Sequence, residues 1–121
     1  MDNVYFEPTI PEIIQHIAII AITYGEKKQT DMMIEEMSEL TKALLKFRRK
    51  LSNNGDISHE LENIMEELAD VQIMLWQIIF LYSYHALYND EQKFFEIMPL
   101  IESKINRQLE RINKEKKEAK T

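Results

Sequence analysis

The 121-residue chain has no cysteine, two glycines and three prolines. The absence of cysteine excludes disulfides, thiolate-bound zinc and a cysteine nucleophile, and it suits a reducing compartment, so we expect a cytoplasmic protein. Scarce glycine and proline leave few tight turns, which argues against a β-sandwich, a barrel or a glycine-rich phosphate loop. The composition therefore favours long helices in a single domain spanning residues 1–121.

Positive charge is also in short supply, because 15 basic residues face 21 acidic ones and the formal net charge is −6. Such a chain repels polyanions, so we expect no nucleic-acid partner, and a cation is the more natural ligand. Residues 71–89 lack charged side chains, and this run meets the usual threshold of about 18 residues for a membrane span. Polar residues interrupt this run and no basic flank precedes it, so we expect a buried helix and no membrane insertion.

Hydrophobic periodicity predicts an all-α bundle of four to five helices. The expected helices run from a Thr9 cap to Tyr24, from Gln29–Asp31 to Lys50, from an Asp56 or Ser58 cap to about Ala86, and onward from Asn89. We expect the last helix to bend or divide at Pro99, where a backbone N–H is missing, and residues 113–121 to form a frayed basic tail.

The third predicted helix has two apolar faces. One contains Val71, Leu75, Ile78 and Tyr82, and the other contains Ile73, Trp76 and Phe80. Two buried faces in so small a chain predict that one of them meets another subunit, so we expect a homodimer or homotetramer.

A weak internal repeat is the most informative feature of the sequence. Residues 34–45 align with residues 65–76 so that Glu36 matches Glu67, Glu39 matches Asp70, and apolar positions also coincide. In each helix the i,i+3 acid pair lies along the edge of the apolar stripe, so packing the stripes together would gather four carboxylates. These carboxylates repel one another unless protons or a metal neutralise them, and hard oxygen ligands select Mg²⁺ or Mn²⁺. The alternative for any single pair is a solvated helix face.

These residues resemble a known family. Glu36–Glu39 followed by Glu67–Asp70 looks like the ExxE…ExxD signature of the MazG-like, all-α nucleoside triphosphate pyrophosphohydrolases, and the resemblance extends from about Tyr24 to Arg111. The resemblance implies an oligomeric bundle of that type. It also implies Mg²⁺-dependent cleavage of a nucleoside or deoxynucleoside triphosphate to the monophosphate and pyrophosphate.

The resemblance also implies roles for individual residues. Glu36, Glu39, Glu67 and Asp70 would be metal ligands, and Glu39 is our choice for the catalytic base. Lys104 and Arg107 match a Lys-x-x-Arg pair that holds phosphate oxygens, although an exposed charged face explains them equally well. Gln29 would line the base pocket or would only cap the second helix.

Two other classes of function remain open. A noncatalytic helical oligomer, acting as an adaptor, would explain the acidity and the apolar run of the third helix, but it leaves the repeated acid pairs unexplained. A catalytically silent relative would bind nucleotide without cleaving it. Turnover measurements and metal titrations separate these classes.

Overall fold

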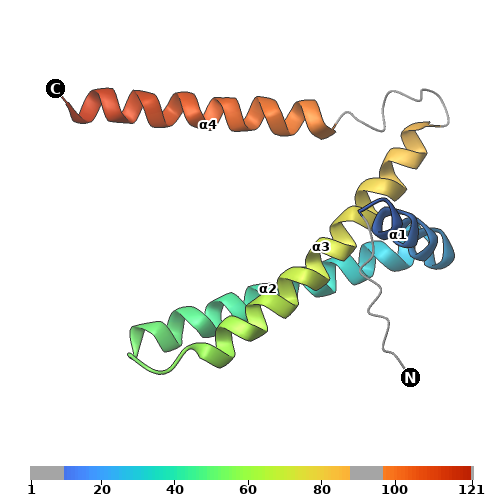
Figure 1. The fold of residues 1–121 in the computed structure, drawn as a ribbon, viewed down its shortest axis with the longest axis horizontal. Coiled ribbons are helices and arrows are strands. Elements are labelled where there is room, and N and C mark those ends of the chain that lie inside the picture. The colour runs from blue at the N-terminus through green and yellow to red at the C-terminus, as the bar shows by residue number, and fades with distance from the viewer. Residues whose placement is uncertain (1–9, 88–96, 121) are drawn as a thin grey trace, which may run out of the picture. The chain divides into compact units, whose positions relative to one another are not determined.

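The computed structural model describes residues 10–87 and 97–120, and within these ranges the chain is helical with no β-strand (Figure 1). The helices are α1 (Ile10–Tyr24), α2 (Glu26–Ser52), α3 (Ser58–Leu87) and α4 (Ile97–Ala119). The prediction of an all-α protein is confirmed. The chain divides into two compact units, Met1–Tyr82 and Ser83–Thr121, which we describe separately.

Helix α1 contacts α2 and provides two of the most buried side chains of the first unit, Ile17 and Ala21. It ends at Gly25, whose φ of 86° lies in the left-handed region that glycine adopts without strain. The Gly25 N–H donates to the Ala21 carbonyl at 2.9 Å, and α2 begins at the next residue. The prediction that the second helix starts at Gln29–Asp31 is therefore late by at least three residues, and the Thr9 cap lies outside the described residues.

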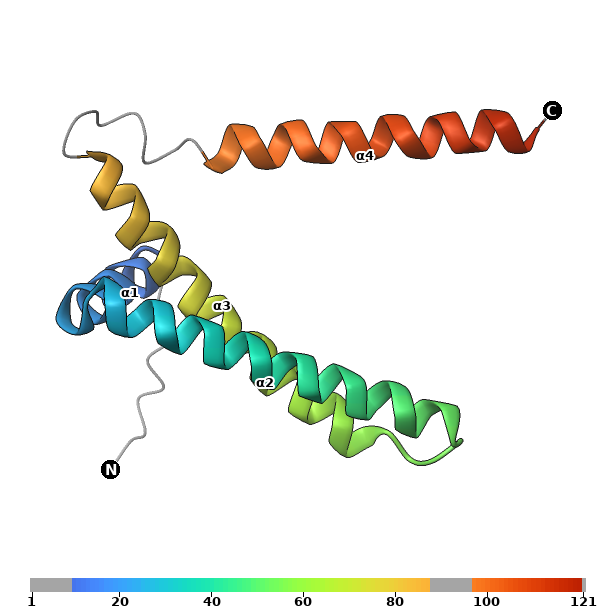
Figure 2. The same ribbon diagram turned by 180° about the vertical axis from the view of Figure 1, so that it is seen from behind.

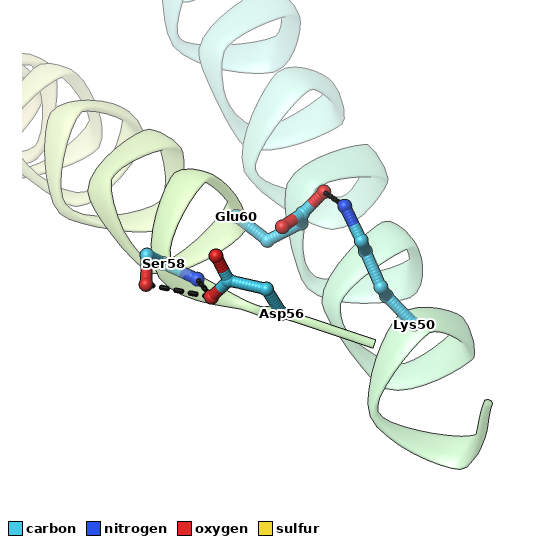
Figure 3. A network of polar contacts seen from close by, with 4 residues as sticks. All are labelled: Lys50, Asp56, Ser58 and Glu60. Atoms are coloured by element: carbon cyan, nitrogen blue, oxygen red, sulfur yellow. Dashed lines mark hydrogen bonds and ion pairs between the residues drawn. The ribbon is translucent and has the colours of Figure 1, made fainter. Parts of the chain in front are cut away.

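Helices α2 and α3 lie side by side as an antiparallel hairpin (Figures 1 and 2). Their connection is short, and the Gly55 N–H donates to the Lys50 carbonyl at 3.3 Å. The Asp56 carboxylate accepts hydrogen bonds from the Ser58 N–H at 3.0 Å and the Ser58 hydroxyl at 2.7 Å, which satisfies a free donor at the start of α3 (Figure 3). The predicted loop and the Asp56 cap are confirmed.

The contact line between α2 and α3, which we call the seam, follows a spacing of alternating three and four residues. On α2 the less exposed positions include Gln29, Met33, Glu36, Leu40, Ala43 and Phe47. On α3 they include Glu60, Ile64, Glu67, Val71, Met74, Ile78 and Leu81. This spacing is typical of helices that cross at a shallow angle with coiled-coil-like packing.

The seam differs in part from the apolar stripes that the sequence predicts. The apolar residues that recur every three or four positions along α2 include Met37, Leu44 and Leu51, and these three are about half exposed, at 50%, 47% and 52%. On α3, Leu75 is 38% and Tyr82 44% exposed, whereas Gln77 is only 1% exposed. In the structure α2 and α3 face each other with positions that include polar residues, so the spacing of apolar residues predicts only part of the seam.

No described helix has both the length and the apolar character needed to cross a bilayer.

The second unit contains α4, which begins at Ile97, so that Pro99 lies in its first turn, where a missing N–H leaves no intrahelical bond unmade. The predicted start at Asn89 falls outside the described residues. Where the sequence predicts a frayed tail, the structure has helix as far as Ala119. None of the described residues of α4 is buried, and its apolar stripe is about half exposed at Met98, Ile101, Ile105, Leu109 and Ile112.

Candidate metal centre

Three carboxylates meet in the middle of the seam. Glu36 comes from α2, and Glu67 and Asp70 come from successive turns of α3. One oxygen from each side chain lies within 4.8 Å of the other two. We call this group the acidic cluster. It contains three of the four residues that the resemblance implies as metal ligands, brought together from positions about 30 residues apart.

The acidic cluster lies partly inside the protein. Glu36 and Glu67 are partly buried and Asp70 is exposed. The Glu67 Oε2 atom is buried and has no hydrogen-bond partner. Within residues 10–87 and 97–120, none of the three carboxylates forms an ion pair with a lysine, arginine or histidine. A buried anion without a counter-charge or hydrogen bond is costly, so this arrangement favours a proton or a cation at the cluster.

The pKa of Glu36 reflects the cost of placing an anion in this cluster. Burial raises the pKa of the Glu36 carboxyl above its ordinary value, and the nearby charges of Asp70 and Glu67 raise that pKa further. Both causes disfavour the ionised form, one by removing water and the other by like-charge repulsion. A divalent cation would reverse the second cause, because it attracts all three carboxylates at once.

Glu39, the predicted fourth ligand and catalytic base, lies outside the group of three. Its carboxylate is exposed and accepts a hydrogen bond from the Lys42 ammonium at 3.2 Å, one turn along α2. Its charge is the smallest of the causes that raise the pKa of Glu36. Glu35 and Glu66, which flank the cluster in sequence, are both exposed.

Gln29 is buried in the seam, with 4% of its surface exposed. Its amide nitrogen donates a hydrogen bond to the Gln77 side-chain oxygen at 2.6 Å, and Gln77 is 1% exposed. Gln29 does not cap α2, because the helix begins at Glu26 and the Gln29 N–H donates to the Gly25 carbonyl at 3.1 Å. The base-binding role remains a prediction that this buried, hydrogen-bonded amide does not favour.

Lys104 and Arg107 lie three residues apart on α4, in the second unit, and both are exposed. They share one side of the helix, as a pair that grips one anion requires. The structure leaves their phosphate-binding role as a prediction.

The sequence interpretation missed Gln77, which it treated as an interruption of an apolar run. A signal was available in the spacing. Gln29 lies seven residues before Glu36 on α2, and Gln77 lies seven residues after Asp70 on α3. In an antiparallel pair of helices, equal spacings in opposite directions place both pairs on the same contact line.

Comparison with protein-family models, with curated proteins and with solved structures finds no match for this chain.

Proposed function

We propose that this protein is a Mg²⁺-dependent nucleotide pyrophosphohydrolase that converts a nucleoside or deoxynucleoside triphosphate to the monophosphate and pyrophosphate. The observation that carries the proposal is the acidic cluster, in which Glu36, Glu67 and Asp70 lie within 4.8 Å of one another without a counter-charge among the described residues. The reaction and its substrates come from the resemblance of the ExxE…ExxD pattern.

The donor set suits a hard divalent cation. All three side chains offer carboxylate oxygens, which Mg²⁺ and Mn²⁺ prefer, and there is no sulfur or imidazole in the group. The buried Glu67 Oε2 atom lacks a hydrogen-bond partner, and a cation bound to this carboxylate would offset the cost of burying its charge. When bound, such an ion would screen the triphosphate charge and lower the pKa of a nucleophilic water.

The protein's own residues would divide the remaining work. Glu36, Glu67 and Asp70 would hold the cation. Glu39, whose exposed carboxylate lies one turn along α2 from Glu36, would accept the proton of the attacking water as the water oxygen bonds to the α-phosphorus and pyrophosphate leaves. Lys104 and Arg107 would donate charge-assisted hydrogen bonds to phosphate oxygens.

The direct test is to incubate the full chain with Mg²⁺ and a panel of ribonucleoside and deoxyribonucleoside triphosphates, and to resolve the products by ³¹P NMR. Monophosphate plus pyrophosphate supports the proposal. Release of orthophosphate alone, or no turnover of any nucleotide, counts against it. Addition of EDTA should stop the reaction, and Mn²⁺ should restore it.

Substitutions test the ligand assignment. Glu36→Gln and Asp70→Asn should each abolish turnover while the protein stays folded, because each replaces a negatively charged ligand with a neutral amide. Glu66→Gln is the matched control, since Glu66 is an exposed neighbour of Glu67 outside the cluster. Activity that survives both cluster substitutions would reject the assignment. Lys104→Ala and Arg107→Ala separately should raise KM if these residues bind phosphate.

One observation favours a second candidate, a noncatalytic helical oligomer. Large apolar side chains are exposed on every described helix, among them Ile22 at 67%, Met65 at 65% and Trp76 at 45%. Such surfaces are typical of proteins that assemble. Calorimetry with Mn²⁺ distinguishes the candidates, because an adaptor predicts no saturable metal site. Light scattering on the eluting protein measures whether the homodimer or homotetramer that we also propose exists.

A further inference from the structure

The buried amide pair Gln29–Gln77 lies on the same seam as the acidic cluster. Gln29 precedes Glu36 by seven residues and Gln77 follows Asp70 by seven residues. Seven residues of helix span about 10.5 Å, so the two contacts are about two turns apart along both helices. Any sliding of α3 along α2 that separates the amides would separate the carboxylates by the same amount.

The contact between the two amides requires a closely defined alignment of α2 and α3. Gln77 is the largest side chain that is fully buried among the described residues, and its partner Gln29 is 4% exposed. Their 2.6 Å hydrogen bond forms in one alignment of the helices, since an amide buried without its partner loses its hydrogen bond to water as well. Apolar neighbours impose no such condition, because they pack acceptably over a range of offsets.

The position of the pair adds to its effect. The connection between α2 and α3 constrains one end of the hairpin, near Lys50 and Glu60. Gln29 and Gln77 lie toward the opposite end, with the acidic cluster between them and the connection. A second polar contact, between the Thr30 and Tyr82 hydroxyls at 2.8 Å, adjoins the amide pair. The open end of the hairpin is thus aligned by polar contacts.

We infer that Gln77, through its hydrogen bond to Gln29, is a positioning residue that sets the alignment of α2 against α3 and thereby brings Glu36 opposite Glu67 and Asp70. A single buried polar pair that fixes helix register at some cost in stability has precedent in coiled coils. The inference goes beyond the proposed function, since it concerns how the acidic cluster is assembled and holds whatever reaction the cluster performs.

The experiment measures helix alignment directly. The chain has no native cysteine, so Lys46→Cys/Gln72→Cys places two nitroxide labels, both at exposed positions of the first unit. In the observed alignment these positions are offset by about 18 Å along the helices, so sliding changes their distance strongly. Double electron–electron resonance then reports the distance distribution without any metal.

In this background we compare the native pair with Gln29→Met/Gln77→Met, in which unbranched side chains of similar size replace both amides. We expect the native pair to give one narrow distance. The double variant should keep its helical content and its unfolding midpoint, yet its distance distribution should broaden or gain a second population several ångströms away. Its Mn²⁺ affinity should fall about tenfold. Preserved stability with lost alignment distinguishes positioning from ordinary packing.

Ile64→Leu is the matched control, because Ile64 is buried in the same seam away from Gln77 and the exchange conserves volume. It should leave both distance and affinity unchanged. Gln77→Asn, which keeps the amide but shortens its reach, covers the case in which the double variant fails to fold, and it should broaden the distribution too.

A native distance distribution in the amide variants would overturn the inference. If the native protein binds no Mn²⁺, the metal centre under "Proposed function" fails, but the distance measurement still decides the role of Gln77.

Discussion

Two regions of one seam carry charge in opposite ways. Near the connection, the Lys50 ammonium lies 3.0 Å from the Glu60 carboxylate, and its hydrogen bond lowers the pKa of Glu60 (Figure 3). In the middle of the seam, Glu36 faces Glu67 and Asp70, and burial together with these charges raises its pKa. An acid meets a base in one region, and acids meet acids in the other.

The two regions share one structural feature on α3. Glu60 and Glu67 lie seven residues apart on α3, and each has a buried Oε2 atom without a hydrogen-bond partner. Lys50 and Glu36 lie fourteen residues apart on α2, on the same side of the helix. The seam therefore holds a carboxylate of α3 in both regions, with the Lys50 ammonium against one and the Glu36 carboxylate against the other. A structural ion pair needs no ligand, whereas the acidic cluster has no counter-charge among the described residues.

The largest expected effect follows from introducing a positively charged side chain into the acidic cluster. Glu36→Lys would place an ammonium opposite Glu67 and Asp70, as Lys50 stands opposite Glu60. We expect Mn²⁺ affinity and nucleotide turnover to fall at least about 100-fold, since one ligand is lost and a like charge repels the ion. Without metal, the unfolding midpoint should rise, because the repulsion is removed. Calorimetry and thermal unfolding measure both effects.

Glu66→Lys is the control for Glu36→Lys, since it makes the same charge change at an exposed neighbouring position. It should alter metal affinity only slightly. Equal losses in the two variants would mean that the general negative field of the protein, and not the acidic cluster, attracts the cation.

The next largest effect comes from the reverse change near the connection. Lys50→Glu would set two carboxylates against each other and leave the buried oxygen of Glu60 without a counter-charge. We expect the unfolding midpoint at pH 7 to fall by several degrees, and less at pH 4, where carboxyls are partly protonated.

The charge-reversed double variant Lys50→Glu/Glu60→Lys tests whether pairing explains the loss at the connection. It should recover most of the unfolding midpoint. Metal affinity should stay close to the native value in both variants, so a large change there would show that the two regions are not independent.

The sequence predicts the helices well because their signals are local. The spacing of apolar residues, the Asp56 cap and the glycine that follows the first helix all act within a few residues. The structure has the helices and the Asp56 cap, and α1 ends before Gly25. The acid repeat also places Glu36 with Glu67 and Asp70, because matching positions on two packed helices share a contact line. Local sequence patterns thus predict the helices and the meeting of these acids between α2 and α3.

The sequence could not show which residues of those helices turn inward. Gln77 is the clearest example, since hydropathy ranks it with surface residues although it is 1% exposed. Its burial depends on a partner 48 residues away, Gln29, which satisfies its amide. Glu39 is the opposite case, because its i,i+3 relation to Glu36 predicts membership of the cluster, whereas its carboxylate is exposed and pairs with Lys42 on the same helix. The way in which α2 and α3 face each other decides both positions, and the sequence does not state it.

A smaller effect distinguishes the two regions by their dependence on pH. The raised pKa of Glu36 means that the folded state binds its proton more tightly than the unfolded state does. Stability from this source is complete below the ordinary pKa of glutamate and is lost as the pH rises through the raised value. Glu36→Gln in EDTA should thus match the native unfolding midpoint near pH 4 and exceed it by a few degrees at pH 7.

Glu60→Gln should show the opposite trend, because the pKa of Glu60 is lowered and its stabilising contribution is present at pH 7 and lost as the pH falls through that lowered value. This variant should be less stable than the native chain at pH 7 and nearly equal to it at pH 3. Parallel pH profiles for the two variants would contradict the contrast between the regions.

The smallest expected effect concerns the cap beside the ion pair. Asp56→Ala removes the acceptor of both Ser58 hydrogen bonds. These bonds also lower the pKa of Asp56, so the loss of stability should appear at neutral pH and disappear in acid. We expect the unfolding midpoint at pH 7 to fall by ~4 °C. Ser58→Ala, which removes only the hydroxyl contact, should cost less. Because Asp56 holds the start of α3 and not its middle, Mn²⁺ affinity should be unchanged in both variants, and a weakened metal site would show that the cap helps to align the acidic cluster.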